Sequence, residues 1–409
     1  MKITCISHAA LLIEVDGFKI VTDPWIVGSA YCEQWYLFPK PETDYAKYLM
    51  DVDYILISHG HEDHLHHDTL KEINKSAHIF FPYTWYEGAV GFFNELGFHK
   101  ITEAVNERSY KLSKNVRITY LANNLDNIVV IESRDKIIVN INDALHSAPQ
   151  GIISYFIEKI KRKWNKVDYL FSGYGGASYF PNTIKFKEKN DIEIGITREQ
   201  FFLDNFCKIA KGINAAYSIP FASDFVLLDD DQRWINKVKF PKGEIKNYFN
   251  EYYADSSCTT QIMELYAGDI ISEGKFVLNS SYHEKLKNND RDELIEKEYQ
   301  DEIIRKRNIK KITENELINI FEKIKVHVNR KSYIVPPEER KELKFAIKIT
   351  DASDNLFIQI DLTGNENKTE LVPDFSPDNI LLLKIKSKTI LHSINNEWGG
   401  DAIIIGYGG

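Results

Sequence analysis

Five of the twelve histidines lie in one nine-residue window that runs from His59 to His67. The window reads His-Gly-His-Glu-Asp-His-Leu-His-His and directly follows Asp53–Ser58, a short apolar run typical of a buried strand. Loops at the carboxyl ends of buried strands are the usual sites of function in layered α/β folds. The window therefore predicts an α/β layer with a chemically active loop at its edge.

The H-x-H-x-D-H spacing within this window predicts a metal centre. In an extended turn, His59 and His61 point the same way and can share one cation. Asp63 and His64 are expected to open the following helix and to face a second cation. Neutral imidazole and carboxylate suit Zn, Fe or Mn, and two such ions can flank a bridging oxygen.

Strand-like and helical segments alternate along the first two thirds of the chain. Lys2–Ser7, Ala10–Val15 and Phe18–Thr22 are strand-like, and Asp16-Gly17 is a two-residue hairpin turn. Such alternation predicts a catalytic α/β domain over residues 1–270.

The rest of the chain divides in two. Residues 271–325 become highly charged and favour helix, which predicts a solvated helical connector. Residues 326–409 predict a small α+β unit, with a hairpin around Asp354-Asn355, a strand-like run at Ile380–Ile385 and a closing apolar run at Ala402–Gly406.

Composition excludes several classes of protein. With 51 Lys+Arg against 60 Asp+Glu the formal charge is −9, which argues against a nucleic-acid binder. No apolar run approaches the ~20 residues of a membrane span. The four cysteines are scattered without a C-x-x-C pair, so a soluble cytoplasmic protein is expected.

The histidine motif resembles the signature of the metallo-β-lactamase superfamily, which implies an αββα sandwich. Further motifs, spread along the whole chain in the same order, resemble the catalytic, non-Rieske region of CMP-N-acetylneuraminate hydroxylases. They are Ile3-Thr-x-x-x-His8-Ala9, Thr22-Asp-Pro-Trp-x-x-Gly28-x-Ala30, Asp53–His59, Val139–Asp143, Gly175-Gly-Ala-Ser178-x-Phe180-Pro181, Ile219–Phe221 and Trp398-x-x-Asp401-x-x-Ile404-x-Gly406.

The resemblance also indicates further metal ligands. Asp143 follows an apolar strand and matches the superfamily's bridging aspartate. Many hydrolases of the superfamily carry another histidine before this strand, but residues 120–126 contain none. Asp126 or Asn124 is expected to substitute. Two histidines with one carboxylate form the ligand set of non-haem iron sites that activate oxygen.

Several other residues are expected near this centre. The resemblance places His8 beside the metals, where it binds substrate or orients a ligand. Asp23 follows a strand and is expected to accept a hydrogen bond from a ligand imidazole and so fix its tautomer. His66 and His67 are expected to be ordinary helix residues, whereas His146 lies close enough in sequence to Asp143 to reach the site.

Two neighbouring segments allow alternative interpretations. The glycine-rich loop Ser172–Ser178 is either a turn or a close approach of backbone to an anion. Trp25, Tyr31, Trp35 and Tyr36 are either core residues or stack on a substrate.

Two functional classes are consistent with these features. The first is a di-iron, O₂-dependent hydroxylase (a monooxygenase) of a small anionic or sugar-nucleotide-like substrate. A Rieske cluster needs two Cys and two His, which this chain does not pair, so a separate ferredoxin or Rieske donor is expected. The alternative is a dinuclear Zn or Mn hydrolase of a phosphoester, lactone or amide, which needs no reductant. The intact motif disfavours a non-catalytic binding protein.

Overall fold

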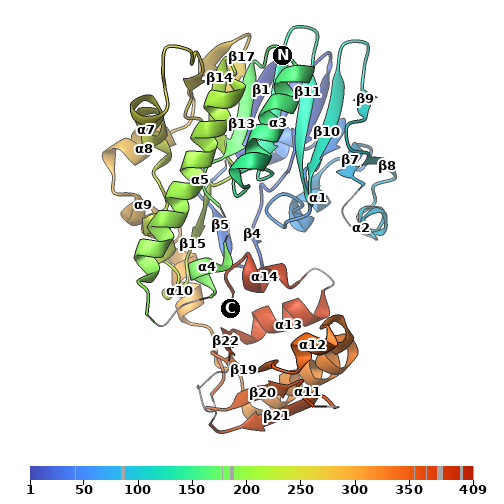
Figure 1. The fold of residues 1–409 in the computed structure, drawn as a ribbon, viewed down its shortest axis with the longest axis vertical. Helices are drawn as coiled ribbons and strands as arrows, with labels where there is room; N and C mark the ends of the chain where they lie inside the picture. The colour runs from blue at the N-terminus through green and yellow to red at the C-terminus, as the bar shows by residue number, and fades with distance from the viewer. Residues whose placement is uncertain are drawn as a thin grey trace.

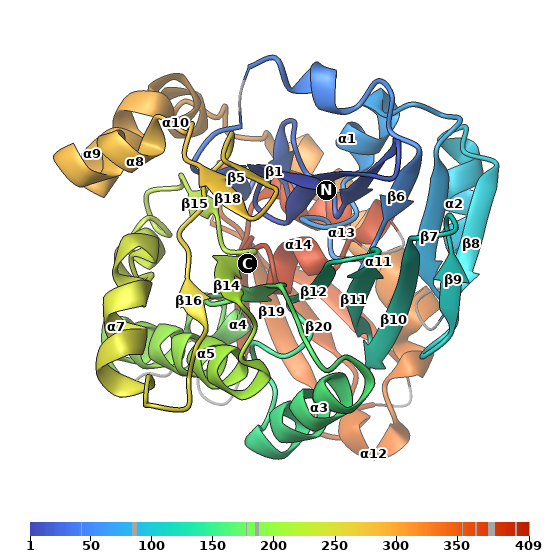
Figure 2. The ribbon, with the colours of Figure 1, turned by 90° about the horizontal axis from the view of Figure 1, so that it is seen from above.

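Two β-sheets packed face to face form the larger part of this computed structural model (Figures 1 and 2). The structure describes residues 1–41, 43–83, 88–176, 178–184, 188–353, 355–364, 366–374, 381–396 and 399–408. Ala177, Asp354, Ile380 and Trp398, which belong to predicted motifs and turns, lie outside these residues.

The first sheet begins with the predicted hairpin. Asp16 and Gly17 have φ of 53° and 85°, the left-handed values that a two-residue turn between twisted strands requires. Within the described residues the strand order is β18 (Lys275–Val277), β17 (Ile270–Ser272), β1 (Lys2–Ser7), β2 (Ala10–Val15), β3 (Phe18–Thr22), β6 (Tyr54–Leu56), β7 (His78–Pro82) and β8 (Lys100–Ala104).

The second sheet is antiparallel at one edge and parallel at the other. Its described strands are, in order, β16 (Gln261–Ile262), β14 (Tyr217–Phe221), β13 (Tyr169–Gly173), β12 (Ile137–Asn142), β11 (Asp126–Glu132), β10 (Arg117–Asn123) and β9 (Ser109–Lys111). The apolar faces of the two sheets form one shared core, which includes Leu11, Ile118 and Phe171.

Helices cover the outer faces of both sheets (Figure 2). α1 (His67–Glu72) and α2 (Ala89–Glu95) pack on the first sheet. α3 (Gln150–Lys163) and α5 (Asp191–Ile213) pack on the second, together with α7 (Ile245–Tyr252). Sheets inside and helices outside confirm the expected αββα sandwich.

A small three-stranded sheet lies beside the sandwich, with β15 (Phe225–Leu227), β5 (Trp35–Leu37) and β4 (Ser29–Ala30). α6 (Trp234–Val238) packs on β15. The other short helical segments are α4 (Tyr179–Asn182) and the 3₁₀ turns Tyr45–Tyr48 and Lys242–Glu244. α8 (Tyr282–Asn288), α9 (Arg291–Glu298) and α10 (Gln300–Arg307) contribute a core with β5 and β15. These three helices therefore pack on the sandwich side of the molecule.

The C-terminal part is built on a four-stranded sheet. The described strands are β21 (Lys368–Val372), β20 (Phe357–Asp361), β19 (Lys344–Ile349) and β22 (Leu381–Ile385). α11 (Glu314–Lys331), which begins with a Thr313–Glu316 capping box, packs on this sheet with α13 (Ser387–Asn395). The 3₁₀ turn Ser332–Ile334 and α12 (Pro337–Arg340) come between α11 and β19 in the chain.

The last helix, α14 (Asp401–Ile404), returns to the sandwich. Ala402 and Tyr407 belong to one core with Trp25, Trp35 and Phe225. The small C-terminal α+β unit is confirmed, whereas the division of the chain at residues 270 and 325 stays a prediction. No helix among the described residues is long and apolar enough to span a bilayer.

Candidate metal centre

Strand ends from both sheets meet at one end of the sandwich. Asp23 follows β3, and the histidine motif follows β6, its parallel neighbour. Asp143 follows β12 of the second sheet, and Asp126 lies at the turn of the β10–β11 hairpin. Segments distant in sequence thus bring their polar side chains to a common edge.

Three overlapping groups of histidine and aspartate converge there. Within each group the ligand atoms lie within 4.8 Å of one another. The groups are His59 with His61 and Asp126, His59 with His64 and Asp143, and His8 with Asp63 and His64. His59 and His64 each belong to two groups, so the arrangement has the form of adjoining sites that share ligands.

Distances in the first group favour a shared cation. His59 Nε2 lies 2.9 Å from His61 Nδ1 and 3.9 Å from Asp126 Oδ1. Asn124, the alternative to Asp126, is exposed at the hairpin turn with φ of 59°. Of the two candidates for the third position, Asp126 is the one within reach.

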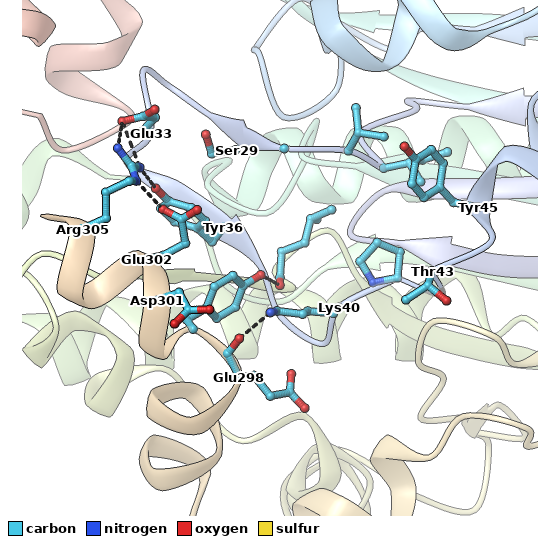
Figure 3. A pocket seen from close by; sticks show the side chains of 16 residues that line it. Ser29, Glu33, Tyr36, Lys40, Thr43, Tyr45, Glu298, Asp301, Glu302 and Arg305 are labelled. Atoms are coloured by element: carbon cyan, nitrogen blue, oxygen red, sulfur yellow. Dashed lines mark hydrogen bonds and ion pairs between the residues drawn. The ribbon is translucent and has the colours of Figure 1, made fainter.

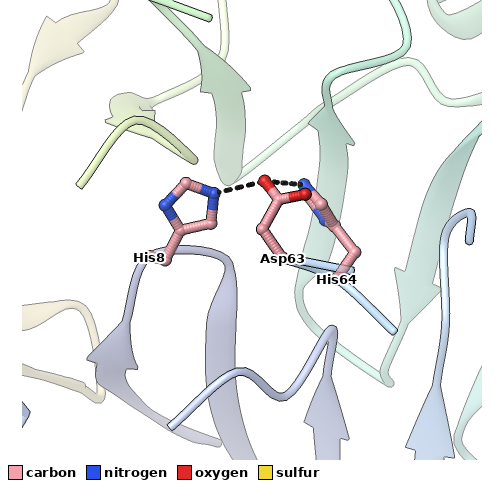
Figure 4. A group of neighbouring side chains, drawn as sticks. All are labelled: His8, Asp63 and His64. Atoms are coloured by element: carbon pink, nitrogen blue, oxygen red, sulfur yellow. Dashed lines mark hydrogen bonds and ion pairs between the residues drawn. The ribbon is translucent and has the colours of Figure 1, made fainter. Parts of the chain in front are cut away.

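In the other groups His64 Nε2 faces the carboxylate of Asp63, which Figure 4 shows, and that of Asp143. It lies 3.4 Å from Asp63 Oδ2 and 3.5 Å from Asp143 Oδ2. Among the described residues, His64 Nε2 and Asp143 Oδ1 are buried without a hydrogen-bond partner. Leaving buried polar atoms unpaired is costly, and an ion between them would satisfy both. The donor set therefore fits a metal.

Asp23 and Ser58 orient the ligand imidazoles. Asp23 is fully buried and accepts hydrogen bonds from Ser58 N and Ser58 Oγ, each at 2.7 Å, and from His64 Nδ1 at 3.1 Å. With its own proton given to Asp23, Ser58 Oγ accepts from His59 Nδ1 at 2.9 Å. Both imidazoles then keep their protons on Nδ1 and leave Nε2 free to bind a cation.

His8 and Tyr31 hold Asp63 from two sides. His8 Nε2 lies 3.0 Å from Asp63 Oδ2, opposite His64 (Figure 4). The Tyr31 hydroxyl donates to Asp63 Oδ1. All three side chains are buried, so the position of Asp63 is strongly determined.

Local electrostatics depend on burial and on this crowding. Burial disfavours the charged form of His64, but Asp63 and Asp143 outweigh it and raise the His64 pKa well above its ordinary value. Burial, followed by the charges of His64 and His61, lowers the pKa of His59. Burial raises the pKa of Asp126. The centre thus attracts positive charge at His64 and keeps His59 neutral.

The C-terminal segment packs beside this centre. Gly406 packs on the Tyr31 ring, and the Tyr407 hydroxyl accepts from Ser178 N at 3.0 Å and donates to Gly176 O at 3.4 Å. Asp401 lies close enough to His61 and Asp63 for their charges to affect its pKa, which burial raises. The end of the described chain is therefore part of the site's surroundings.

The glycines after β13 are required by side chains of the site. A Cβ at Gly176 would lie 2.7 Å from the His146 ring, and one at Gly175 would lie 2.6 Å from Ser223 Oγ. His146 bonds through Nδ1 to the Asp143 carbonyl. Close packing against Ser223 and His146 therefore gives these two glycines a structural reason.

The helix after the histidine motif starts later than the sequence predicts. Asp63 and His64 do not open a helix: they lie in a turn, and α1 begins at His67. The reason is that His66, which is buried, caps the helix by accepting from Thr69 N. His67 is exposed on α1.

The aromatic residues after Asp23 are core residues. Trp25, Tyr31 and Trp35 are almost fully buried, and Trp35 stacks on Phe225 with the ring centroids 3.5 Å apart. Tyr36 is also buried. Trp25, Tyr31 and Trp35 therefore pack in the core, whereas Tyr36 also lines a cavity of about 540 Å³.

Comparison with known proteins agrees with this geometry. Residues 2–140 match the family model described as the beta-lactamase superfamily domain. This part of the chain is therefore similar to the beta-lactamase superfamily domain. Together with the converging His and Asp groups, this places it among metal-dependent enzyme folds. The roles of the individual ligands stay predictions.

Curated relatives of this domain include two named proteins. The chain is 26% identical over 250 residues to cytidine monophosphate-N-acetylneuraminic acid hydroxylase of Mus musculus, a match over 58% of this chain and 41% of the relative. It is 26% identical over 247 residues to a putative Rieske 2Fe-2S iron-sulfur protein of Mycolicibacterium smegmatis, over 58% and 46%. The matched part is smaller than the spread of motifs implied, and it covers less than half of each relative.

A solved structure is also similar to the domain. CmlA, a diiron beta-hydroxylase from Streptomyces venezuelae, is 14% identical with a TM-score of 0.43, covering 64% of this chain and 52% of that chain.

Proposed function

We propose that the chain is the catalytic part of a di-iron, O₂-dependent hydroxylase of a small anionic, sugar-nucleotide-like molecule. The observation that carries this proposal is the group of His59, His61 and Asp126. Two imidazoles and one carboxylate form the ligand set of oxygen-activating non-haem iron. The curated relative named as a hydroxylase of a cytidine monophosphate sugar supports the substrate class.

Each group of residues has a role in this proposal. His59, His61 and Asp126 would hold one iron, Asp63 and His64 would hold the other, and Asp143 would be a ligand shared by both. Iron bound there supplies the reductive activation of dioxygen that hydroxylation needs.

The surrounding residues keep the ligands oriented. Asp23 and Ser58 retain the Nδ1 protons of His64 and His59, so that their Nε2 atoms stay available. His8 and Tyr31 hold the Asp63 carboxylate in place. We assign His8 and Asp23 to positioning rather than to proton transfer, because both are buried.

Hydroxylation needs an outside source of electrons. One substrate C–H bond, O₂, two electrons and two protons become one C–OH group and water. No group of metal-binding residues in the described part of the chain contains a cysteine, so we propose a separate ferredoxin or Rieske donor. The relative named as a Rieske protein supports this pairing.

Metal identity tests the proposal directly. We expect about two irons per chain in anaerobically purified protein, with a coupled di-iron Mössbauer spectrum, and product formation only with a reductant. Two zinc or manganese ions that support ester, lactone or amide hydrolysis without reductant would instead make it a hydrolase.

A substitution sharpens the experiment. Asp126→His supplies the third histidine of many superfamily hydrolases, so the variant should retain zinc in preference to iron and lose hydroxylation. Asp135→His, at an exposed turn, is the matched control and should behave as the parent. If Asp126→His keeps two irons and full turnover, the ligand assignment is wrong.

A further inference from the structure

A cavity of about 530 Å³ lies behind the three-stranded sheet, apart from the metal centre. Its lining includes Phe38, Asp224, Lys239, Lys242 and Arg291. The Phe225 ring separates it from the metal centre, since its centroid lies 6.1 Å from that of His8 and 3.4 Å from Lys239 Nζ. The cavity is therefore a distinct site, and binding of a ligand there does not depend on the proposed hydroxylation.

Two cations at this cavity have no carboxylate partner. Lys239 Nζ donates to the carbonyls of Ser223 at 2.8 Å and Phe225 at 2.9 Å. Arg291 Nη1 donates to the Asn236 carbonyl at 2.8 Å. Among the described residues neither forms an ion pair, although each is largely withdrawn from solvent.

The carboxylates nearest to Lys239 are already engaged. Asp224 Oδ2 lies 2.7 Å from Lys242 Nζ, and Glu199 Oε1 lies 2.7 Å from Arg198 Nη2. Lys239 and Arg291 therefore lie in the cavity wall without an ion-pair partner among the described residues.

The other acidic residues that line the cavity either accept hydrogen bonds within the protein or are exposed to solvent. Glu264 accepts a hydrogen bond from the Tyr266 hydroxyl. Asp290 caps α9 by accepting from the amides of Asp292 and Glu293. Glu244 is exposed at the rim, where Lys287 is exposed as well and His283 pairs with Asp269.

Proximity of the two cations is unfavourable in the empty cavity. Burial, followed by the charge of Arg291, lowers the pKa of Lys239 to about 7. Like charges kept together and shielded from water need compensation. An anion between the two groups would supply it.

The other large cavity, of about 540 Å³, shows the contrast (Figure 3). There Arg305 pairs with Glu33 and Glu302, and Lys40 donates to the Glu298 carbonyl beside the Tyr299 ring. Of these two cations only Lys40 lacks a carboxylate partner among the described residues, and four carboxylates, Glu33, Glu298, Asp301 and Glu302, line that cavity.

We propose that the cavity behind the three-stranded sheet binds a phosphomonoester, with the phosphoryl group between Lys239 and Arg291. Two uncompensated cations match a phosphoryl group, which carries nearly two negative charges at neutral pH. The planar guanidinium of Arg291 suits phosphate oxygens. The volume exceeds that of a phosphate ion, and the rings of Phe38, Phe240 and Tyr266 line the rest. An aromatic or apolar organic part therefore fits beside them.

Calorimetric titration of the full chain with phenyl phosphate tests this proposal. We expect phenyl phosphate to bind more tightly than inorganic phosphate, and phenol to show no binding. Arg291→Gln should weaken phenyl phosphate binding about 10-fold or more, because a charged hydrogen-bonding group is lost. Lys239→Met should weaken it similarly, and Lys287→Gln, at the exposed rim, is the matched control.

Two further outcomes separate this site from the metal centre. Asp143→Ala, which disrupts the proposed metal centre, should leave phenyl phosphate binding unchanged, whatever the reaction proves to be. Thermal melts of the Arg291→Gln and Lys239→Met variants establish that they are folded. If phenyl phosphate does not bind the parent, or binds both folded variants as it binds the parent, the proposal is wrong.

Discussion

Asp23→Asn is the substitution whose effect can be derived most directly from the geometry. The parent carboxylate accepts three hydrogen bonds, two from Ser58 and one from His64 Nδ1. An asparagine must turn its amide nitrogen toward one of these donors. Facing His64, the amide would donate to Nδ1 and move the imidazole proton to Nε2, the atom that faces Asp63 and Asp143. If the amide nitrogen faced Ser58 N instead, two buried N–H donors would point at each other and neither would have an acceptor.

The expected cost is a weaker metal site. Losing the partner that orients a ligand histidine reduces metal affinity about 10- to 100-fold, equivalent to about 1.4–2.7 kcal/mol of binding free energy. His59 is affected as well, because Ser58 Oγ and His64 Nδ1 share the acceptor Asp23 Oδ2, and an amide nitrogen there would remove the acceptor of the Ser58 proton. Both metals should therefore bind more weakly.

Competition with a chelator measures this affinity in the parent and the variant. The matched control is Asp53→Asn, at the opposite end of β6, where the exposed carboxylate accepts a hydrogen bond from Lys19 N and from no other described residue. We expect the control to retain both metals with parental affinity. Equal metal affinity in Asp23→Asn and the parent would refute the argument that Asp23 determines the His64 tautomer.

Three other predictions concern separate parts of the chain. Asp143→Ala should lose most of one metal and essentially all turnover. The control His67→Ala, on exposed helix surface, should keep its metals and its turnover. An Asp143→Ala variant that retains two metals would overturn the bridging role. Gly406→Ala places a methyl group against Tyr31, whereas at Gly400 a Cβ meets nothing within 4 Å. Gly406→Ala should therefore lose ~1–3 kcal/mol of unfolding free energy and bind metal more weakly at Asp63. Gly400→Ala, the control, should do neither, and denaturation and metal analysis measure both effects. Finally, the folded-state pKa of Lys239 is about 7, against an ordinary 10.5. Between these two pH values the unfolded state binds more protons than the folded state, so the free energy of unfolding should rise with pH. Lys239→Met should flatten that rise in denaturation experiments without phosphate. An unchanged slope would contradict the assigned pKa.

Local sequence patterns predicted much of the fold. Asp16-Gly17 forms its turn because these two residues readily adopt the left-handed backbone conformation. The short apolar run before His59 forms a strand because a short, continuous apolar segment is typical of a buried strand. The histidine window does follow the carboxyl end of a buried strand, β6, as the strand-end rule predicts. These predictions succeeded because each depends on a few neighbouring residues.

Contacts between distant segments were beyond such reasoning. His8 lies beside Asp63 across 55 residues of sequence, and Tyr407 reaches Gly176 across 231. Lys239 and Arg291 likewise share a cavity without any sequence spacing that relates them. The start of α1 was misjudged for a local reason, since a histidine is an uncommon N-cap.

The return of α14 to the sandwich means that the polypeptide connects the two halves of the molecule twice. One crossing leads away after α10, and the other leads back between α13 and α14 (Figure 1). Two crossings resist the free hinge rotation that a single linker permits. Cutting the chain at residue 330 would therefore remove Tyr407 and Asp401 along with the four-stranded sheet, and any loss of activity would have two causes. Excising residues 314–386 and joining the ends would remove the sheet while retaining the residues beside the metal centre.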